Sequence, residues 1–398
     1  MSWSKYSVED RKIPGITVIA FVFIIISLYS HSKLVFFLAS FFLIIVSANQ
    51  LYLKNAGQRL FFENLAMKKH FFINDKDKWI LTFQNGGYPI LKGELRIYFD
   101  QCVRPMDDTV EPSLSMYEVL IPFSILSNQT TQVAIPFEAK MRGIAKIRQL
   151  ECRIPSLIGF GETILDYKFH IKQEAIVYPQ PIPVKGLKNQ VSVHQGISPV
   201  PYSVLEDRLG PIGTRDYVPT DSFNRIHWKA SARKQMLQTK EFERISEKGW
   251  NLSINVADGY AVTGQLELLL SCVAEFSYYA AKNQVPYSLC INVRSAGSTP
   301  FLYIPKGEGK EHLQKILEIL ASINVHNSIF PYEKMLTIYN RHLAVQPFFV
   351  HAGIRSAAVD DVLHHQASKG VYLIELKVED DYGFFTVLKT QHGRRGLL

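Results

Sequence analysis

The sequence of 398 residues has few cysteines and none of the short motifs that mark common enzyme classes. Its four cysteines (Cys102, Cys152, Cys272 and Cys290) form no CxxC pair, so neither a disulfide scaffold nor a Cys-based zinc site is supported. The patterns GxSxG, HExxH and GxxxxGK(S/T) do not occur. The sequence thus predicts a protein that is not an enzyme and has no cofactor, with small buried thiols in a reducing compartment.

Charge is also sparse, and it is unbalanced. Apolar residues make up 47% of the chain and charged residues only 20%, a composition that excludes wholesale disorder. The formal net charge is +8. A basic chain is typical of nucleic-acid partners or of the inner face of a membrane.

Two long apolar runs occupy the N-terminal region. Twenty uncharged residues separate Lys12 from Lys33, and twenty more separate Lys33 from Lys54. About 20 apolar residues are enough to cross the hydrocarbon core of a bilayer as a helix. The sequence therefore predicts transmembrane segments from Ile13 to Ser32 and from Leu34 to Leu53, joined as a hairpin. The alternative is a signal peptide, with 46–48 (Val-Ser-Ala) resembling a cleavage site.

The basic residues around these runs predict their orientation. Three cations precede the first run and four follow the second, whereas the connecting turn offers only Lys33. Because Lys and Arg are enriched on the cytoplasmic side, both flanks should be cytoplasmic. We therefore expect a multi-pass protein of the cell membrane, the plasma membrane, with its N-terminus and soluble domains in the cytoplasm.

The remainder of the chain changes character twice, which predicts a multidomain protein. Residues 55–180 show short alternating runs separated by turn residues, typical of a β-sandwich. Residues 181–248 begin as a Pro-rich linker. Residues 249–398 alternate buried-type strands with amphipathic helices, for example 263–282, 311–323 and 357–368, as in an open doubly wound α/β sheet. With residues 1–54 as the hairpin, four segments result.

The segment 215–233 is the most unusual in the chain. It combines cations, acids, His227 and Trp228 in a short span after a turn at 219–221. We expect a helix over 224–234, which would place Arg225, Lys229 and Arg233 one turn apart on a single face, with His227 and Trp228 pointing elsewhere and free to pack inward. The candidate partner-binding or structural residues are Arg215, Asp216, Tyr217, Asp221, Arg225, His227, Trp228, Lys229 and Arg233.

This segment resembles the motif of the domain of unknown function 58 family, R-x-Y-x-x-G-D-x-x-R-x-I-x-W-x-x-(S/T)-A-R. The chain departs from it at Thr220, where the family usually has Gly. Further similar segments are Arg142-Gly143, Gly159-Phe160-Gly161 and Val177-Tyr178-Pro179. The matching motif positions are Arg215, Tyr217, Asp221, Arg225, Ile226 or its neighbour, Trp228, Ser231, Ala232 and Arg233.

The resemblance implies a membrane-anchored protein with a von Willebrand factor A-like α/β domain after the motif. It also implies a partner, a MoxR-type AAA+ ATPase, because such proteins are commonly encoded together. It implies no enzymatic activity. We therefore expect a scaffold or adaptor that binds the ATPase through its cytoplasmic domains.

A domain of this type often binds Mg²⁺ through D-x-S-x-S after its first strand. Here Asp258, Tyr260 and Val262 occupy those positions, and the compact hydroxyl ligands are lost. We expect no metal at this degenerate site, with Asp258 holding a turn or capping a helix. The alternative is a metal-dependent adhesion module or enzyme that uses the α/β domain.

The basic segment leaves two more interpretations open. Its charged side chains either form an internal network or present a docking surface for a partner. Binding of anionic lipid or nucleic acid is a second alternative, of which lipid is favoured because no recognisable nucleic-acid fold accompanies the cations.

Overall fold

The computed structural model describes residues 2–8, 12–29, 33–106, 111–112, 116–159, 161–193, 206–244, 249–379 and 382–388. The chain divides into two compact units, Met1–Tyr178 and Pro179–Leu398. The first unit contains two apolar helices and two β-sheets. The second contains an α/β sheet and a small separate hairpin.

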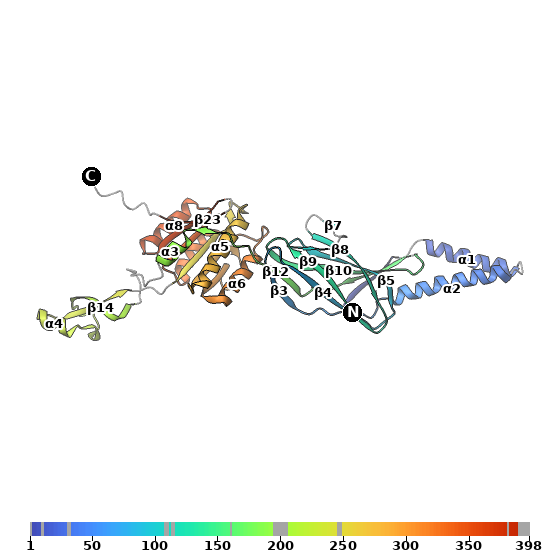
Figure 1. The fold of residues 1–398 in the computed structure, drawn as a ribbon, viewed down its shortest axis with the longest axis horizontal. Coiled ribbons are helices and arrows are strands. Elements are labelled where there is room, and N and C mark those ends of the chain that lie inside the picture. The colour runs from blue at the N-terminus through green and yellow to red at the C-terminus, as the bar shows by residue number, and fades with distance from the viewer. Residues whose placement is uncertain are drawn as a thin grey trace. The chain divides into compact units, whose positions relative to one another are not determined.

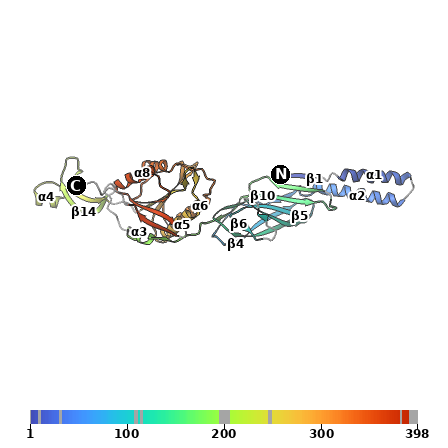
Figure 2. The same ribbon diagram turned by 90° about the horizontal axis from the view of Figure 1, so that it is seen from above.

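Two helices occupy the predicted apolar runs. They are α1 (Lys12–Tyr29) and α2 (Lys33–Asn55), and they run side by side in both views (Figures 1 and 2). Helix α2 is long and apolar enough to cross a membrane, and the stretch Thr17–Tyr29 of α1 is a shorter apolar helix. Within the part of the chain that the structure describes, one helix thus meets this criterion of length and composition.

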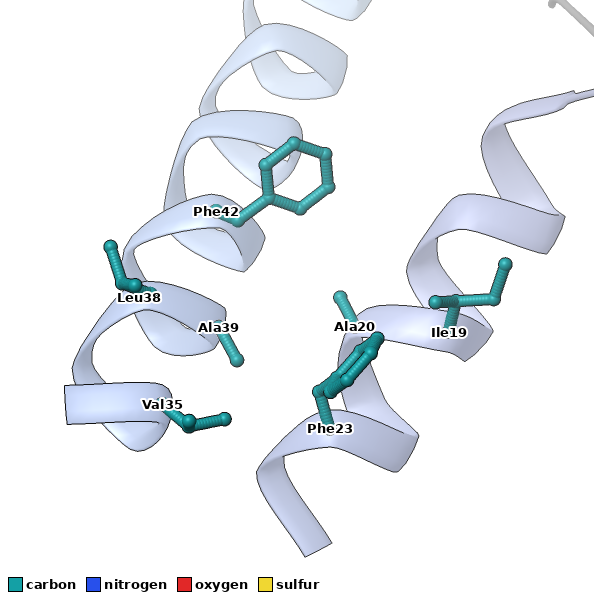
Figure 3. Close-up of a pocket in the computed structure, with 7 residues that line it drawn as sticks. All are labelled: Ile19, Ala20, Phe23, Val35, Leu38, Ala39 and Phe42. Carbon is teal, nitrogen blue, oxygen red and sulfur yellow. The ribbon is translucent and has the colours of Figure 1, made fainter. Parts of the chain in front are cut away.

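The two helices are not closely packed along their whole length. An apolar groove of about 450 Å³ opens between them, lined by Ile19 and Phe23 of α1 and by Val35, Leu38 and Phe42 of α2 (Figure 3). All of these side chains are apolar. Ala20 and Ala39 also line the groove and are themselves buried.

The N-terminal strand was not expected from the sequence. Strand β1 (Trp3–Val8) pairs antiparallel with β11 (Glu162–Tyr167), more than 150 residues away along the chain. Trp3 packs edge-on against Tyr167, with ring centroids 5.2 Å apart. The chain before α1 and the sheets after α2 therefore meet at the same end of the helix pair.

The sheets of the first unit share one hydrophobic core. Among the described residues, eight strands form one sheet, in which β1, β11, β10, β5, β8 and β7 follow one another and β12 and β3 extend from β10; β2, β4, β9 and β6 form the other. Trp79 of β4 faces Phe99 of β5, and Phe83 faces Phe123 of β8, so the alternating apolar residues of both sheets meet. The remaining strands are β2 (Leu60–Phe62), β3 (Met67–Phe71), β4 (Lys76–Asn85), β5 (Ile90–Asp100), β6 (Val103–Pro105), β7 (Glu111–Pro112), β8 (Met116–Ile125), β9 (Gln129–Ala139), β10 (Gly143–Pro155) and β12 (Gln173–Val177).

The second unit is built on a mixed sheet of seven strands among the described residues, in the order β13-β23-β22-β21-β16-β19-β20. The four central strands are parallel, and β23 and β20 are antiparallel. The strands are β13 (Val184–Lys185), β16 (Trp250–Asn255), β19 (Tyr287–Arg294), β20 (Phe301–Gly307), β21 (Phe348–Gly353), β22 (Tyr372–Glu379) and β23 (Tyr382–Val387).

Helices cover both faces of this sheet. Trp250 of β16 packs against Phe276 of α5. Ser253, three residues further along the same strand, accepts a hydrogen bond from Tyr332 of α7 on the other face of the sheet. Because neighbouring strand residues point to opposite faces, α5 and α7 lie on opposite sides. The helices are α3 (Leu187–Val193), α5 (Leu266–Lys282), α6 (Gly309–Ser322), α7 (Tyr332–His342) and α8 (Ala357–Ser368).

Several elements differ from the sequence-based expectation. Helix α7, strand β23 and strand β13 were not predicted, and β13 and α3 lie in the stretch assigned to a Pro-rich linker. Pro183 directly precedes β13, and β13 is an edge strand, one of the places in a sheet where proline is tolerated. The expected helix at 357–368 is confirmed.

Candidate functional site

The unusual segment folds into a small hairpin with a helix at its tip. Strands β14 (Glu206–Asp216) and β15 (Gln238–Arg244) pair antiparallel, and a 3-10 turn, η1 (Phe223–Arg225), and helix α4 (Trp228–Lys234) lie between them (Figure 1). We call residues 213–242 the motif hairpin.

Arg215 and Asp221 form a two-pronged ion pair within the motif hairpin. The guanidinium Nη1 and Nη2 donate to the two carboxylate oxygens at 2.7 and 2.6 Å. The same carboxylate accepts from the Val218 amide at 3.1 Å and the Thr239 hydroxyl at 3.0 Å. The hydrogen bonds from the Arg215 guanidinium hold the pKa of Asp221 well below its usual range, and the Val218 amide makes the second-largest contribution. The carboxylate therefore closes the 218–221 turn onto both strands.

Gln238 forms a second polar connection. Its side chain is fully buried, and its amide Nε2 donates to Asp216 Oδ1 at 2.6 Å. Lys234 Nζ donates to the Gln238 Oε1 at 3.1 Å. Asp216 and Lys234, on opposite sides of the hairpin, are thus joined through one buried amide.

The start of α4 is fixed by His227. Its ring Nδ1 accepts from the Ala230 amide at 3.2 Å, as an N-cap side chain does, and its own amide donates to the Gln238 carbonyl at 2.7 Å. Ser231 Oγ donates to the His227 carbonyl and accepts from the Gln238 amide at 2.9 Å. The tip helix is therefore tied to β15 by hydrogen bonds rather than by a large apolar contact.

The prediction of one helix over 224–234 is wrong. Ile226 adopts an extended backbone conformation (φ −65°, ψ 131°), pairs with Thr239 and is almost fully buried. This pairing separates η1 from α4, so Arg225 does not lie on the same helix as Lys229. Only Lys229 and Arg233 remain one turn apart on α4.

Trp228 does not pack inward. Its side chain is 59% exposed, and that of Phe223 is 69% exposed. The two rings contact each other edge to face, with centroids 5.6 Å apart. Trp228 can point outward because Ile226, not Trp228, fills the interior position beside β15.

The motif hairpin therefore exposes apolar and cationic side chains while its acids are used internally. Lys229 and Arg233 are exposed on α4, and Tyr217 is half-buried. Aromatic side chains, Met and Arg are enriched in protein interfaces, whereas Lys is depleted from their centres. We call the following exposed residues the motif surface: Val218, Phe223, Trp228, Lys229, Arg233, Met236 and Leu237.

Asp258 lies at the turn between β17 (Ala257–Asp258) and β18 (Ala261–Val262) and is exposed, as is Tyr260. Among the described residues, no group of three or more His, Cys, Asp or Glu side chains is arranged to hold a metal ion. Near this turn, the Asn255 side chain at the end of β16 donates to the Ile354 carbonyl at 2.7 Å and accepts from Asn292 of β19 at 2.8 Å.

Sequence reasoning missed a buried polar cluster beneath α7. Tyr332 Oη lies 2.7 Å from His351 Nδ1 and 2.9 Å from Ser253 Oγ, and His351 Nε2 lies 3.1 Å from the Gly353 carbonyl. With its proton on Nε2, the imidazole donates to Gly353 and accepts from Tyr332. Burial lowers the pKa of His351 to about 4 and raises that of Tyr332.

This cluster is sealed from solvent, so it offers no surface for a reaction with a substrate. The signal in the sequence was the alternation of Asn251, Ser253 and Asn255 along an otherwise apolar strand. Such alternation predicts a polar face, which a buried sheet tolerates only when each group has a partner.

Part of the chain is similar to a known family and to one curated protein. The family described as "Protein of unknown function DUF58" matches residues 213–375, which include the motif hairpin and most of the α/β sheet. This match covers 163 of the 398 residues, less than half of the chain. The uncharacterised protein YeaD of Bacillus subtilis (strain 168) is 30% identical over 136 residues, covering 34% of this chain and 29% of YeaD. The shared part is thus less than a third of that relative.

Solved structures resemble the chain only distantly. A non-cellulosomal cohesin from Archaeoglobus fulgidus is 10% identical, with a TM-score of 0.20, covering 33% of this chain and 95% of the cohesin. The sporulation control protein Spo0M from Bacillus subtilis is 14% identical, with a TM-score of 0.17, covering 30% of this chain and 49% of Spo0M. Scores this low carry no conclusion about the fold or function of this chain.

Proposed function

We propose that this chain is a two-span membrane protein whose DUF58 region docks another protein and performs no chemistry of its own. The observation that carries the proposal is the motif surface. Its Phe223–Trp228 ring pair is exposed on the same short segment as the exposed Lys229 and Arg233, while Asp216 and Asp221 are hydrogen-bonded to other residues of the hairpin. A partner with an apolar pocket and acidic rim would complement this surface.

Anchoring by two spans is supported by the first unit. Strand β1 pairs with β11, so the residues before α1 and the sheets after α2 occupy the same side. A single crossing would separate these two strands by the thickness of a bilayer, about 30 Å of hydrocarbon. The basic flanks favour the cytoplasm for that common side. On this proposal α1 and α2 form the transmembrane hairpin.

The partner class follows from the family resemblance. We propose a MoxR-type AAA+ ATPase, with the α/β sheet acting as a von Willebrand factor A-like domain beside the motif hairpin. In the parallel part of that sheet, β16 lies between β21 and β19. In α/β sheets of this kind, ligands bind at the loops that follow the carboxyl ends of the strands.

Co-purification tests the docking proposal. The full chain is extracted in detergent as wild type, as Trp228→Ala with Phe223→Ala, and as Lys229→Ala with Arg233→Ala. We expect both double variants to lower recovery of the ATPase at least tenfold, because hot-spot truncations typically cost about 2 kcal/mol or more. Tyr260→Ala is the matched control, since it removes another fully exposed aromatic ring from the same unit. Equal recovery by all variants would contradict the proposal.

The same variants separate the protein partner from anionic lipid. If the cations serve lipid, Lys229→Ala with Arg233→Ala weakens binding of phosphatidylglycerol vesicles, and the loss disappears at high salt. In that case Trp228→Ala with Phe223→Ala leaves the binding of these vesicles unchanged. Dependence on both rings and cations supports a protein partner.

A further inference from the structure

The turn between β10 and β11 carries an exposed apolar tip beside α2. Leu157 is 52% exposed and Ile158 is half-buried. The backbone amide of Leu157 donates to Asn49 Oδ1 on α2 at 3.1 Å, and Asn49 is itself almost fully buried. The tip of the turn is therefore held at the level of Asn49 along the helix.

The length of α2 sets the depth of that level. From Leu34 to Asn49 an α-helix rises about 22 Å, whereas the hydrocarbon core is about 30 Å thick. With Lys33 at the far boundary, Asn49 lies roughly 8 Å short of the near boundary, and a tilted helix would place it deeper still. Leu157 then lies within the lipid, not in water.

The backbone at this junction is suited to a lipid environment. Polar main-chain groups must find protein partners there, because no water is available. The Ser156 amide donates to the Gly161 carbonyl at 3.0 Å, and Thr163 Oγ1 donates to the Leu53 carbonyl at 3.1 Å. Asn49 supplies the acceptor for the Leu157 amide, which explains why this amide side chain of α2 is buried.

The charged groups near the turn lie closer to the sheets. Lys5 Nζ donates to the carbonyls of Leu53, Lys54 and Ala56, one to two helical turns beyond Asn49. Glu162 stands at the base of the turn, opposite the exposed Val8 of β1. Along α2, the apolar tip therefore lies at the level expected for the hydrocarbon, and Lys5 lies nearer the level expected for the membrane interface.

We propose that the β10–β11 turn is inserted into the lipid hydrocarbon, with Leu157 as its anchor and Asn49 as the residue that docks it on α2. The inference rests on the proposed transmembrane role of α2 and goes beyond it, because a span alone leaves the sheets free to stand off the bilayer. The inserted turn instead fixes the first unit against the membrane surface.

Fluorescence from single labels tests this insertion. Leu157→Cys, Ile44→Cys and Met141→Cys are each labelled with an environment-sensitive fluorophore in the full chain, then reconstituted into phosphatidylcholine–phosphatidylglycerol vesicles that carry nitroxide lipids. Met141 is the matched control: it is 49% exposed and precedes the other end of β10. Ile44, 65% exposed on α2, reports on the span. The native thiols are buried or half-buried, with pKa values raised by burial, so they label slowly at neutral pH.

We expect the labels at positions 157 and 44 to show blue-shifted emission and strong quenching by the nitroxide, and the label at 141 to show neither. A lipid-exposed label at 44 with a water-exposed label at 157 would overturn the inserted turn and leave the anchoring intact. A water-exposed label at 44 would overturn both. The unlabelled wild-type chain, treated with the same reagent, gives the background from native cysteines.

Discussion

Asp221 is the residue on which the internal bonding of the motif hairpin converges, with four donors on one carboxylate. Asp221→Asn keeps the shape but removes the charge, and it leaves Arg215 without its two-pronged partner. We expect amide exchange across residues 213–242, measured by mass spectrometry on the full chain, to become several-fold faster. Asp258→Asn, which changes an exposed aspartate outside the hairpin, should leave that exchange unaltered.

The lowered pKa of Asp221 also determines how the stability of the motif hairpin depends on pH. Because Arg215 lowers the pKa of Asp221 in the folded hairpin, the stabilisation is complete above the unfolded value of 3.8 and is lost as the pH falls through the folded pKa. Protection of the hairpin should therefore stay constant from neutral pH down to about 5, after correction for intrinsic exchange. Loss of protection already at that pH would argue against the ion pair.

His351 gives the α/β unit a different response to acid. Burial lowers its pKa from 6.5 to about 4, with the nearby Arg355 adding to the effect and the Gly353 carbonyl opposing it. The neutral ring is bound by Tyr332 and Gly353, so stability is complete above pH 6.5 and falls toward pH 4. The integrated loss is about 3 kcal/mol.

Thermal unfolding of the full chain in detergent, followed between pH 7 and 4, measures this loss. We expect His351→Asn to unfold at a lower temperature near neutral pH but with a weaker dependence on pH. His364→Asn, at an exposed position of α8, should keep the wild-type slope. An unchanged slope in His351→Asn would assign the acid response to other groups.

At the scale of elements, the C-terminus of α2 depends on a cap from a distant strand. The Lys5 ammonium lies 2.7–2.8 Å from three carbonyls that end the helix, Leu53, Lys54 and Ala56. Lys5→Met removes the cap, and we expect the first unit to lose about 1–2 kcal/mol of stability. Urea unfolding in detergent, with Lys92→Met at an exposed position of β5 as control, measures the difference. Equal midpoints would show that water replaces the ammonium at no cost.

Elements defined by local pattern were predictable, and those defined by distant partners were not. Helix α8 has its apolar stripe and its Ser356 N-cap within its own sequence. Strand β1, by contrast, forms through its pairing with the distant β11. The extended residue that separates η1 from α4 likewise depends on the pairing of Ile226 with Thr239. In the motif hairpin, the residue types indicated a charged network, but the partner of each charge depended on strand register, which residue spacing does not specify.

At the scale of the whole molecule, the pairing of β1 with β11 is compatible with the proposed membrane anchoring only if the chain crosses the bilayer an even number of times between these strands. On the proposed topology, with the basic flanks inside, the end of α1 should be accessible from outside and the second unit should be enclosed. Tyr29→Cys, at the end of α1, should react with a membrane-impermeant maleimide on intact cells, whereas Tyr260→Cys should react only after permeabilisation. Labelling of both from outside would place the DUF58 region beyond the membrane and exclude a cytoplasmic ATPase as its partner. Protection of Tyr29→Cys with labelling of Tyr260→Cys would reverse the orientation while keeping both spans, because β1 and β11 would still share one side.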